Sequence, residues 1–166
     1  MYVAEVLLNA VLLLLLIWIA MFVVILAHEA GHALMYRILF RARDWHITVG
    51  TGRLILSRKR FTLRAFMITG FCRCPRSGEG SRCHAIMVLL GGPLANVCLL
   101  VLLMALSPTV QASEMTLWRQ NLAWLMSFAA LVNVFQLIAA LLPVRLPVGH
   151  MKHYVSDGMR IMRIVK

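Results

Sequence analysis

The sequence predicts an α-helical membrane protein with three transmembrane helices and a small β-hairpin or meander between the first two. Of its 166 residues, 61% are hydrophobic, well above the roughly 45–50% of soluble domains, and the mean hydropathy is +0.84. The apolar residues form three long runs, and the basic residues lie almost entirely between or after these runs. The length suits one domain, which we expect to cover residues 1–166.

The first apolar run extends from Val6 to Ala27 without a charged residue, a glycine or a proline. It is long enough to cross a hydrocarbon core of about 30 Å, and we expect a helix over residues 6–36. A cleaved signal peptide is disfavoured because the residues before the run contain Glu5 and no Lys or Arg. Two later apolar runs predict further spans at 84–106 and 118–142.

The distribution of the basic residues predicts the orientation of these helices. Of the 17 Lys and Arg residues, only Arg119 lies outside the segments 37–82 and 143–166. The positive-inside rule then places the N-terminus outside and the C-terminus in the cytoplasm. We interpret the net charge of +11 as an orientation signal with some affinity for anionic lipid, and not as a sign of nucleic-acid binding.

The segment between the first two runs, about residues 45–82, is expected to lie at the cytoplasmic membrane face. Its β-branched and aromatic residues, with a turn signal at Gly50-Thr51-Gly52, predict strands from about Trp45 to Thr69. The glycine-, serine- and proline-containing stretch from Cys72 to Cys83 predicts a loop. A reducing cytoplasm makes disulfide bonds among its cysteines unexpected.

Three ionisable residues interrupt the first apolar run. His28 and His32 are four residues apart, so one helix face presents both imidazoles, and Glu29 stands beside the first. This His-Glu-x-x-His pattern is typical of zinc sites in which the glutamate acts as general base. Satisfied structural histidines are the alternative, but each such group costs about 2.5–3.5 kcal/mol to insert into a membrane, which favours a shared metal. Arg37, the next basic residue, puts the site roughly 8–13 Å below the cytoplasmic surface.

Two further positions could complete this site. The second run contains Gly-Gly-Pro-Leu-Ala-Asn at 91–96, where Asn96 could donate a hydrogen bond to an oxyanion or simply bond a neighbouring helix. Elimination of the other acidic residues leaves Asp157 as the best third ligand, the alternative being a turn carboxylate before Gly158. A separate zinc site in the loop, built from Cys72, Cys74, Cys83 and His84, is less expected because Cys-x-Cys is not the usual ligand spacing.

In this order on apolar helices, the three motifs at 28–32, 92–96 and 157–158 resemble the site-2 protease family of intramembrane zinc metalloproteases. The resemblance implies a three-helix metalloprotease core with one zinc per chain, held by His28, His32 and Asp157, and Glu29 as the base. It also implies that the β-element guides an unwound substrate segment by strand pairing. In this sequence the guiding positions would be Ile47, Val49, Leu54 and Ile55.

The resemblance implies membrane-spanning or membrane-associated protein substrates, cleaved near the cytoplasmic face. The family commonly places Asn three residues before a Pro, with Asp-Gly soon after. Here Ala140 precedes Pro143, and Asp157 follows that proline by fourteen residues, so the segment between them must fold back. A metal transporter and a catalytically silent membrane binding protein of the same fold remain alternatives.

Overall fold

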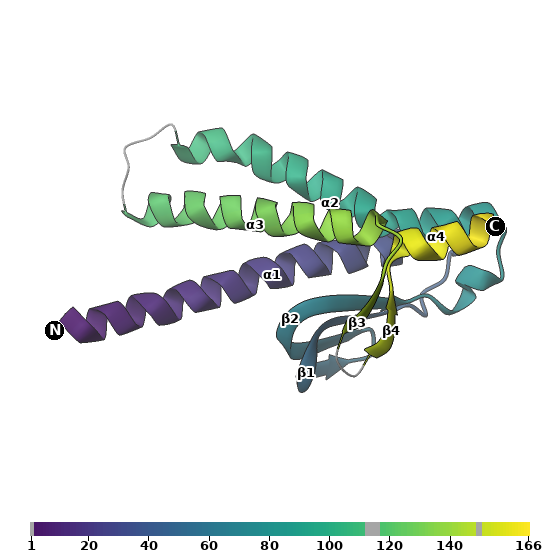
Figure 1. Cartoon of the computed structure of the whole chain (residues 1–166), viewed down its shortest axis with the longest axis horizontal. Helices are drawn as coiled ribbons and strands as arrows, with labels where there is room; N and C mark the ends of the chain where they lie inside the picture. The colour runs from purple at the N-terminus through teal and green to yellow at the C-terminus, as the bar shows by residue number, and fades with distance from the viewer. Residues whose placement is uncertain (1, 112–116, 149–150) are drawn as a thin grey trace.

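The computed structural model describes residues 2–111, 117–148 and 151–166, and three long helices dominate it (Figure 1). They are α1 (Tyr2–Phe40), α2 (Arg82–Gln111) and α3 (Leu117–Leu141). Three stretches within them are long and apolar enough to cross a membrane: Ala4–Phe40, Arg82–Ser107 and Arg119–Leu141. The prediction of three candidate membrane-spanning helices is therefore confirmed.

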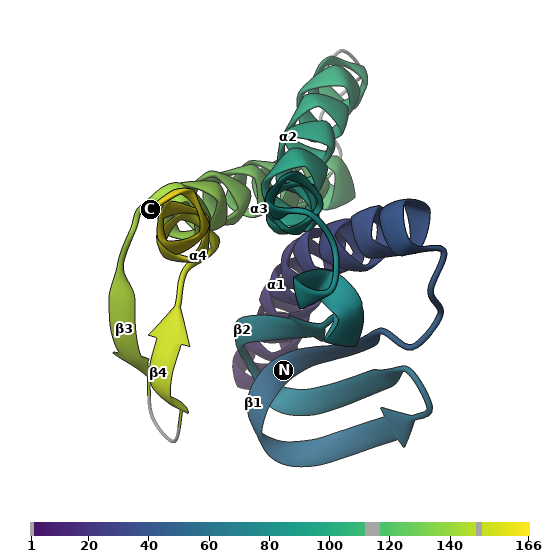
Figure 2. The same cartoon turned by 90° about the vertical axis from the view of Figure 1, so that its right-hand side faces the viewer.

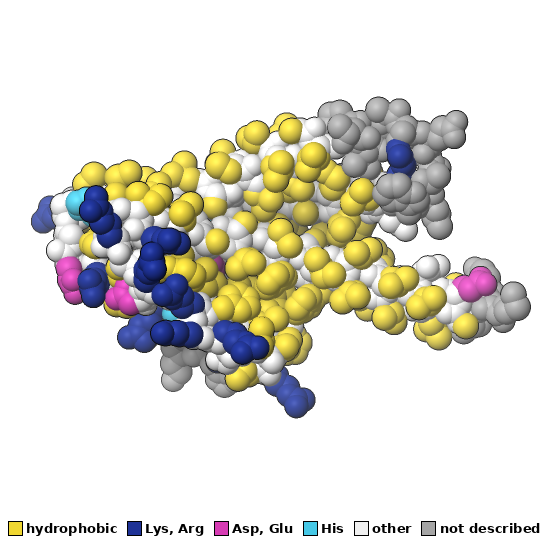
Figure 3. All heavy atoms as spheres, turned by 180° about the vertical axis from the view of Figure 1, so that it is seen from behind, with side chains coloured by type: hydrophobic (Ala, Val, Ile, Leu, Met, Phe, Trp, Pro, Cys, Tyr) yellow, Lys and Arg dark blue, Asp and Glu magenta, His cyan; other side chains and the backbone are white. Residues whose placement is uncertain are grey.

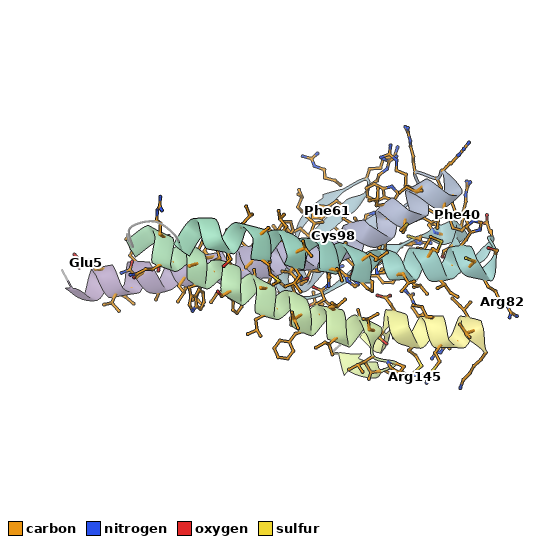
Figure 4. All side chains as sticks on the ribbon, turned by 90° about the horizontal axis from the view of Figure 1, so that it is seen from above. Glu5, Phe40, Phe61, Arg82, Cys98 and Arg145 are labelled. Atoms are coloured by element: carbon orange, nitrogen blue, oxygen red, sulfur yellow. The ribbon has the colours of Figure 1, made fainter. Side chains whose placement is uncertain are left out.

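Apolar side chains cover most of the helical surface, whereas basic side chains gather at one end of the molecule (Figure 3). Leu7, Leu14 and Val101 are each more than 60% exposed, as expected for side chains that face lipid. Figure 4 shows Glu5 at one end of the helices and Arg82 at the other. We call the end that contains Arg82 the basic end.

Close approach of α1 and α2 depends on a pair of glycines. A Cβ atom added at Gly31 would collide with the carbonyl of Gly91, and one added at Gly91 would collide with the carbonyl of Gly31. Small residues at such crossings let membrane helices pack backbone to backbone. The sequence predicts a helix over residues 6–36, and α1 continues four residues further to Phe40, ending where Arg41 adopts a positive φ of 49°.

The β-element is a two-stranded antiparallel sheet of β1 (His46–Arg58) and β2 (Phe61–Arg73), which confirms that part of the prediction. Gly50 and Gly52, with φ of 85° and 79°, lie inside β1, so the expected turn is a bend within one strand. Because of the bend, residues 47–49 pair with 70–72 on one side and with 61–63 on the other. The sheet also reaches Arg73, so the expected loop begins two residues later than predicted.

The sheet packs on α1 through an apolar cluster. Ile47, Val49 and Met67 from the sheet pack with Ile25 of α1 in this cluster. Trp18 of α1 donates a hydrogen bond of 2.9 Å to the carbonyl of Ala65. These contacts fix the sheet beside the residues of the metal motif. The segment 68–73, which we call the outer edge of β2, has β1 on one side only.

The segment after Pro143 folds back as a second hairpin, followed by a short helix (Figure 2). The hairpin consists of β3 (Arg145–Val148) and β4 (Met151–Val155), and α4 covers Asp157–Val165. Ser156 joins them: its hydroxyl donates to the Leu142 carbonyl at 2.6 Å and accepts from the Met159 N–H at 3.2 Å. The chain thereby returns to the end of α3 just before Asp157. The short 3-10 helix η1 (Pro75–Gly78) precedes α2.

Candidate active site

His28, His32 and Asp157 meet at one point, although Asp157 is far from the histidines in the sequence. His28 Nε2 lies 3.2 Å from Asp157 Oδ2 and 3.2 Å from His32 Nε2. His32 Nε2 lies 3.2 Å from the same aspartate oxygen. All three residues are buried, and in the described part of the chain they are the one group of three or more His, Cys, Asp or Glu that could hold a metal ion.

The triangle of these atoms fits a zinc ion. Ligands about 2.0–2.1 Å from a tetrahedral zinc are about 3.3–3.4 Å from one another, close to the separations found here. Two imidazoles and one carboxylate form a donor set typical of catalytic zinc, which keeps its fourth position open. The three residues therefore fit the ion that the sequence motif implies.

Helix α2 orients the ring of His32. The carbonyl of Val88 accepts a hydrogen bond of 2.8 Å from His32 Nδ1, which points Nε2 of the ring toward His28 and Asp157. Pro93 has no N–H, so α2 lacks the helical hydrogen bond that the Leu89 carbonyl would otherwise accept from residue 93. The Gly92 N–H lies 3.3 Å from the same ring nitrogen. The backbone of α2 just before and within the Gly-Gly-Pro segment therefore contacts the candidate metal site at His32.

Asp157 is the first residue of α4, and its position follows from close packing at the start of that helix. A Cβ added at Gly158 would collide with the carbonyl of Leu141, so glycine here lets α4 begin directly against the end of α3. Burial alone would raise the pKa of the Asp157 carboxyl, but hydrogen bonds with His28 and His32 hold it well below its usual range. Asp157 is therefore ionised, as a metal ligand requires.

Glu29 is buried between α1 and the outer edge of β2. A Cβ added at Gly70 would lie 2.5 Å from Glu29 Oε1, so only glycine at this position leaves room for the carboxylate. The same carboxylate faces the backbone N–H of Cys72. Glu29 thus lies between the candidate metal ligands and a strand edge that has no partner on that side among the described residues.

Gly92 and Asn96 of α2 flank the histidines. A Cβ added at Gly92 would lie 2.5 Å from His32 Nε2 and 2.7 Å from His28 Nε2. The Asn96 side chain interacts weakly with His28, and within the described residues neither of its amide atoms has a full hydrogen-bond partner. Asn133 of α3 donates a 2.8 Å hydrogen bond to the Asn96 carbonyl. Asn96 is therefore held in place with an amide available to a ligand.

A cleft of about 940 Å³ leads from these groups toward the basic end. Its walls come from the outer edge of β2, the segment around η1, the first turns of α2, and α4. Figure 4 shows α4 running alongside the part of α2 that contains Arg82. His28, Glu29, His32 and Asp157 all line the cleft, so the candidate metal ligands and the Glu29 carboxylate are accessible from it.

The residues expected to guide a substrate lie away from this cleft. Ile47 and Val49 are buried in the sheet core, and their segment has partners on both sides. We call residues 53–58, the part of β1 that follows the bend, its outer arm. In this arm Leu54 and Ile55 are 53% and 56% exposed. None of the four lines the cleft, whereas residues 70–73 do. The edge nearest Glu29 is thus the outer edge of β2, which sequence reasoning missed; Gly70 within a β-branched run was the available signal.

The cysteine loop is not gathered into a metal site in the described part of the chain. The sulfur atoms of Cys72 and Cys74 share a hydrogen bond of 3.5 Å. This hydrogen bond, together with burial, raises the pKa of Cys72. Cys83 is exposed. His84 shares a hydrogen bond with Ser81 and contacts the ring of Phe40.

A comparison with protein families decides the classification. The model of peptidase family M50 matches residues 16–113, more than half of the chain. The chain belongs to peptidase family M50, the site-2 protease family. The M50 family consists of metallopeptidases, in agreement with the resemblance found in the sequence. No individual curated protein matches the chain.

The M50 match includes the first two motifs but ends before α3. His28, Glu29, His32 and Asn96 lie inside the matched range, and Asp157 lies beyond it. The assignment of Asp157 as a ligand therefore depends on the geometry of the three ligand atoms. The sequence predicts the same residue by elimination but gives no sign of Ser156, whose side chain ties the chain just before Asp157 to the end of α3.

Proposed function

We propose that this chain is a zinc-dependent endopeptidase that hydrolyses peptide bonds of membrane-spanning or membrane-associated proteins. The observation that carries the proposal is the triangle of His28 Nε2, His32 Nε2 and Asp157 Oδ2 with sides of 3.2 Å. A buried carboxylate, Glu29, lies beside it in the same cleft. Membership of a metallopeptidase family supports the same conclusion.

In this proposal His28, His32 and Asp157 hold one zinc ion per chain. When bound, zinc polarises the substrate carbonyl and lowers the pKa of water at its open position to about 7. Glu29 takes the proton from the attacking water and passes it to the amine that leaves. Asn96 donates a hydrogen bond from its unpartnered amide to the carbonyl oxygen as negative charge develops there.

We further propose that the substrate binds as an added strand on the outer edge of β2. Hydrolysis needs an unwound segment, because the backbone of a helix is closed by its own hydrogen bonds. An unpartnered strand edge offers such a segment main-chain hydrogen bonds. The position of Gly70 and Cys72 beside Glu29 supports this edge, in place of Ile47, Val49, Leu54 and Ile55.

We also propose that the basic end lies in the cytoplasm, which places the active site in the membrane near its cytoplasmic face. The gathering of basic side chains at that end supports this orientation (Figure 3). A membrane-impermeant thiol reagent added to intact cells should label Glu5→Cys and leave the exposed native Cys83 unlabelled. Labelling of Cys83 without Glu5→Cys would reverse the orientation.

The experiment that tests the activity compares wild type with Glu29→Gln, both purified with zinc, on denatured casein as an unfolded probe. We expect the variant to lose about 10²- to 10⁴-fold in cleavage rate, because an amide cannot accept the proton. It should keep one zinc per chain, measured by atomic emission, since the ligands are intact. Cleavage by Glu29→Gln at the wild-type rate would remove this residue as the base. A wild-type protein that binds zinc and cleaves nothing would instead indicate a silent binding protein.

A further inference from the structure

The walls of the cleft carry four arginines that the proposed chemistry does not use. They are Arg73 at the end of β2, Arg82 at the start of α2, and Arg160 and Arg163 on α4. We call these four the arginine rim. All four are exposed, and within the described residues none of them forms an ion pair. The carboxylates that line the cleft are Glu29 and Asp157, both buried. The rim is therefore a positive surface around the entrance, and the carboxylates that line the cleft lie deeper, at the candidate metal site.

Helix α4 links this positive surface directly to the reaction site. Asp157, Arg160 and Ile164 are separated by three and four residues, so they lie on one face of α4, and all three line the cleft. Arg160 is close enough to Glu29 to interact with its carboxylate electrostatically. A peptide that leaves the metal ligands along α4 therefore meets Arg160 first and Arg163 next.

We propose that the arginine rim selects substrates with acidic side chains on the cytoplasmic side of the cleaved bond. This inference rests on the endopeptidase function proposed above and adds the chemical class of the substrate. Arg160 and Arg163 lie about 4.5 and 9 Å along the helix from Asp157. An extended peptide advances about 3.3 Å per residue, so the acidic side chains fall within about four residues of the cleaved bond.

An acidic peptide fits the rim better than anionic lipid does. The four arginines face the same cleft as the catalytic carboxylate, and they come from three different elements that surround it. Arg53 and Arg58, in contrast, are exposed on the outer arm of β1 and do not line the cleft. These two residues therefore provide a matched control for charge reversal.

The first test measures cleavage preference. The zinc-loaded full chain, in nanodiscs of phosphatidylcholine, digests a peptide library derived from a proteome, and mass spectrometry identifies the cleaved bonds. We expect Asp and Glu to be enriched within four residues on one side of the bond. Arg160→Glu/Arg163→Glu should replace this preference by Lys and Arg, whereas Arg53→Glu/Arg58→Glu should keep the wild-type profile. The same profile in all three proteins would overturn the inference.

The second test measures binding without cleavage, so that it stands apart from the peptidase activity. Two fluorescent peptides with one apolar segment, followed by four Glu or by four Lys, are titrated into Glu29→Gln protein. We expect the acidic peptide to bind about three- to tenfold more tightly, less so at high salt, and to lose this advantage when Arg160 and Arg163 are both changed to Glu. Equal affinities would overturn the inference even if the enzyme cleaves peptides.

A last comparison separates the peptide from lipid. Nanodiscs that contain phosphatidylglycerol should leave the preference for the acidic peptide in place. If they abolish it, the rim binds headgroups and the inference is wrong. Preferential binding of the acidic peptide by a protein that cleaves nothing would retain the acidic ligand class and reject the endopeptidase function.

Discussion

Replacement of Gly92 by alanine should weaken zinc binding although it favours the helix. Alanine is better than glycine inside a helix by about 1 kcal/mol, so helix propensity alone predicts a more stable α2. The added methyl carbon, however, would lie 2.5 Å from His32 Nε2 and 2.7 Å from His28 Nε2. A zinc ion about 2.0–2.1 Å from both nitrogens needs the same space. The two effects have opposite signs, and this makes the substitution informative.

The expected loss follows from how far the ligands must move. Real Cβ atoms essentially never lie within 3.0 Å of such an atom, so the rings must retreat by about half an ångström or more. Metal sites require ligand distances within about 0.2 Å of their usual values. We expect zinc affinity to fall by about 10- to 100-fold, the loss typical when the support of a ligand is removed, and cleavage to fall with it.

Zinc affinity is measured by competition with a chromogenic chelator, and folding by circular dichroism of the detergent-solubilised chain. Gly78→Ala is the matched control, since a Cβ there has no neighbour within 4 Å. It should bind zinc as the wild type does. Wild-type zinc affinity in Gly92→Ala, with normal helicity, would refute the placement of the ion between His28 and His32.

Two further predictions concern the third ligand and the substrate edge. Asp157→Asn should weaken zinc binding and stop cleavage, whereas replacement of the three loop cysteines by serine should leave one zinc per chain; the opposite result, by metal analysis, would move the site to the loop. Ile68→Pro removes an N–H from the outer edge of β2 and should slow cleavage with zinc retained. Ile55→Pro, at a similarly exposed position on β1 outside the outer edge of β2, should not. Equal rates in both variants would reject the edge as the substrate guide.

The features predicted from sequence are those that depend on near neighbours in the chain. A long apolar run without glycine or proline specifies a membrane helix by itself, and α1 follows from it. Two histidines four residues apart must share a helix face, so the spacing of His28 and His32 already implied a common ligand position. Both inferences need only local geometry.

The strand edge could not be predicted in the same way. A β-branched pattern indicates strands, but it does not specify which backbone edge remains open. That choice depends on the bend at Gly50 and Gly52, which places residues 47–49 between two partners and leaves 68–73 at the margin. Of the four positions that the sequence predicted as substrate guides, Ile47 and Val49 lie in the doubly paired segment, and Leu54 and Ile55 lie on β1 beyond the bend.

The position of Asp157 shows that what matters in such a motif is where the aspartate lies in three dimensions, and not how many residues separate it from the proline. The resemblance to the site-2 protease family predicts an Asp-Gly soon after a proline, whereas here Asp157 follows Pro143 by fourteen residues. The intervening segment forms an antiparallel hairpin in which Arg145 pairs with Val155, so its two ends are adjacent. Ser156 then bonds backward: its N–H donates to the Val144 carbonyl at 3.2 Å, and its hydroxyl donates to the Leu142 carbonyl at 2.6 Å. A hairpin returns to its start whatever its length. The insertion therefore lengthens the chain between the proline and the aspartate without moving the aspartate away from the histidines.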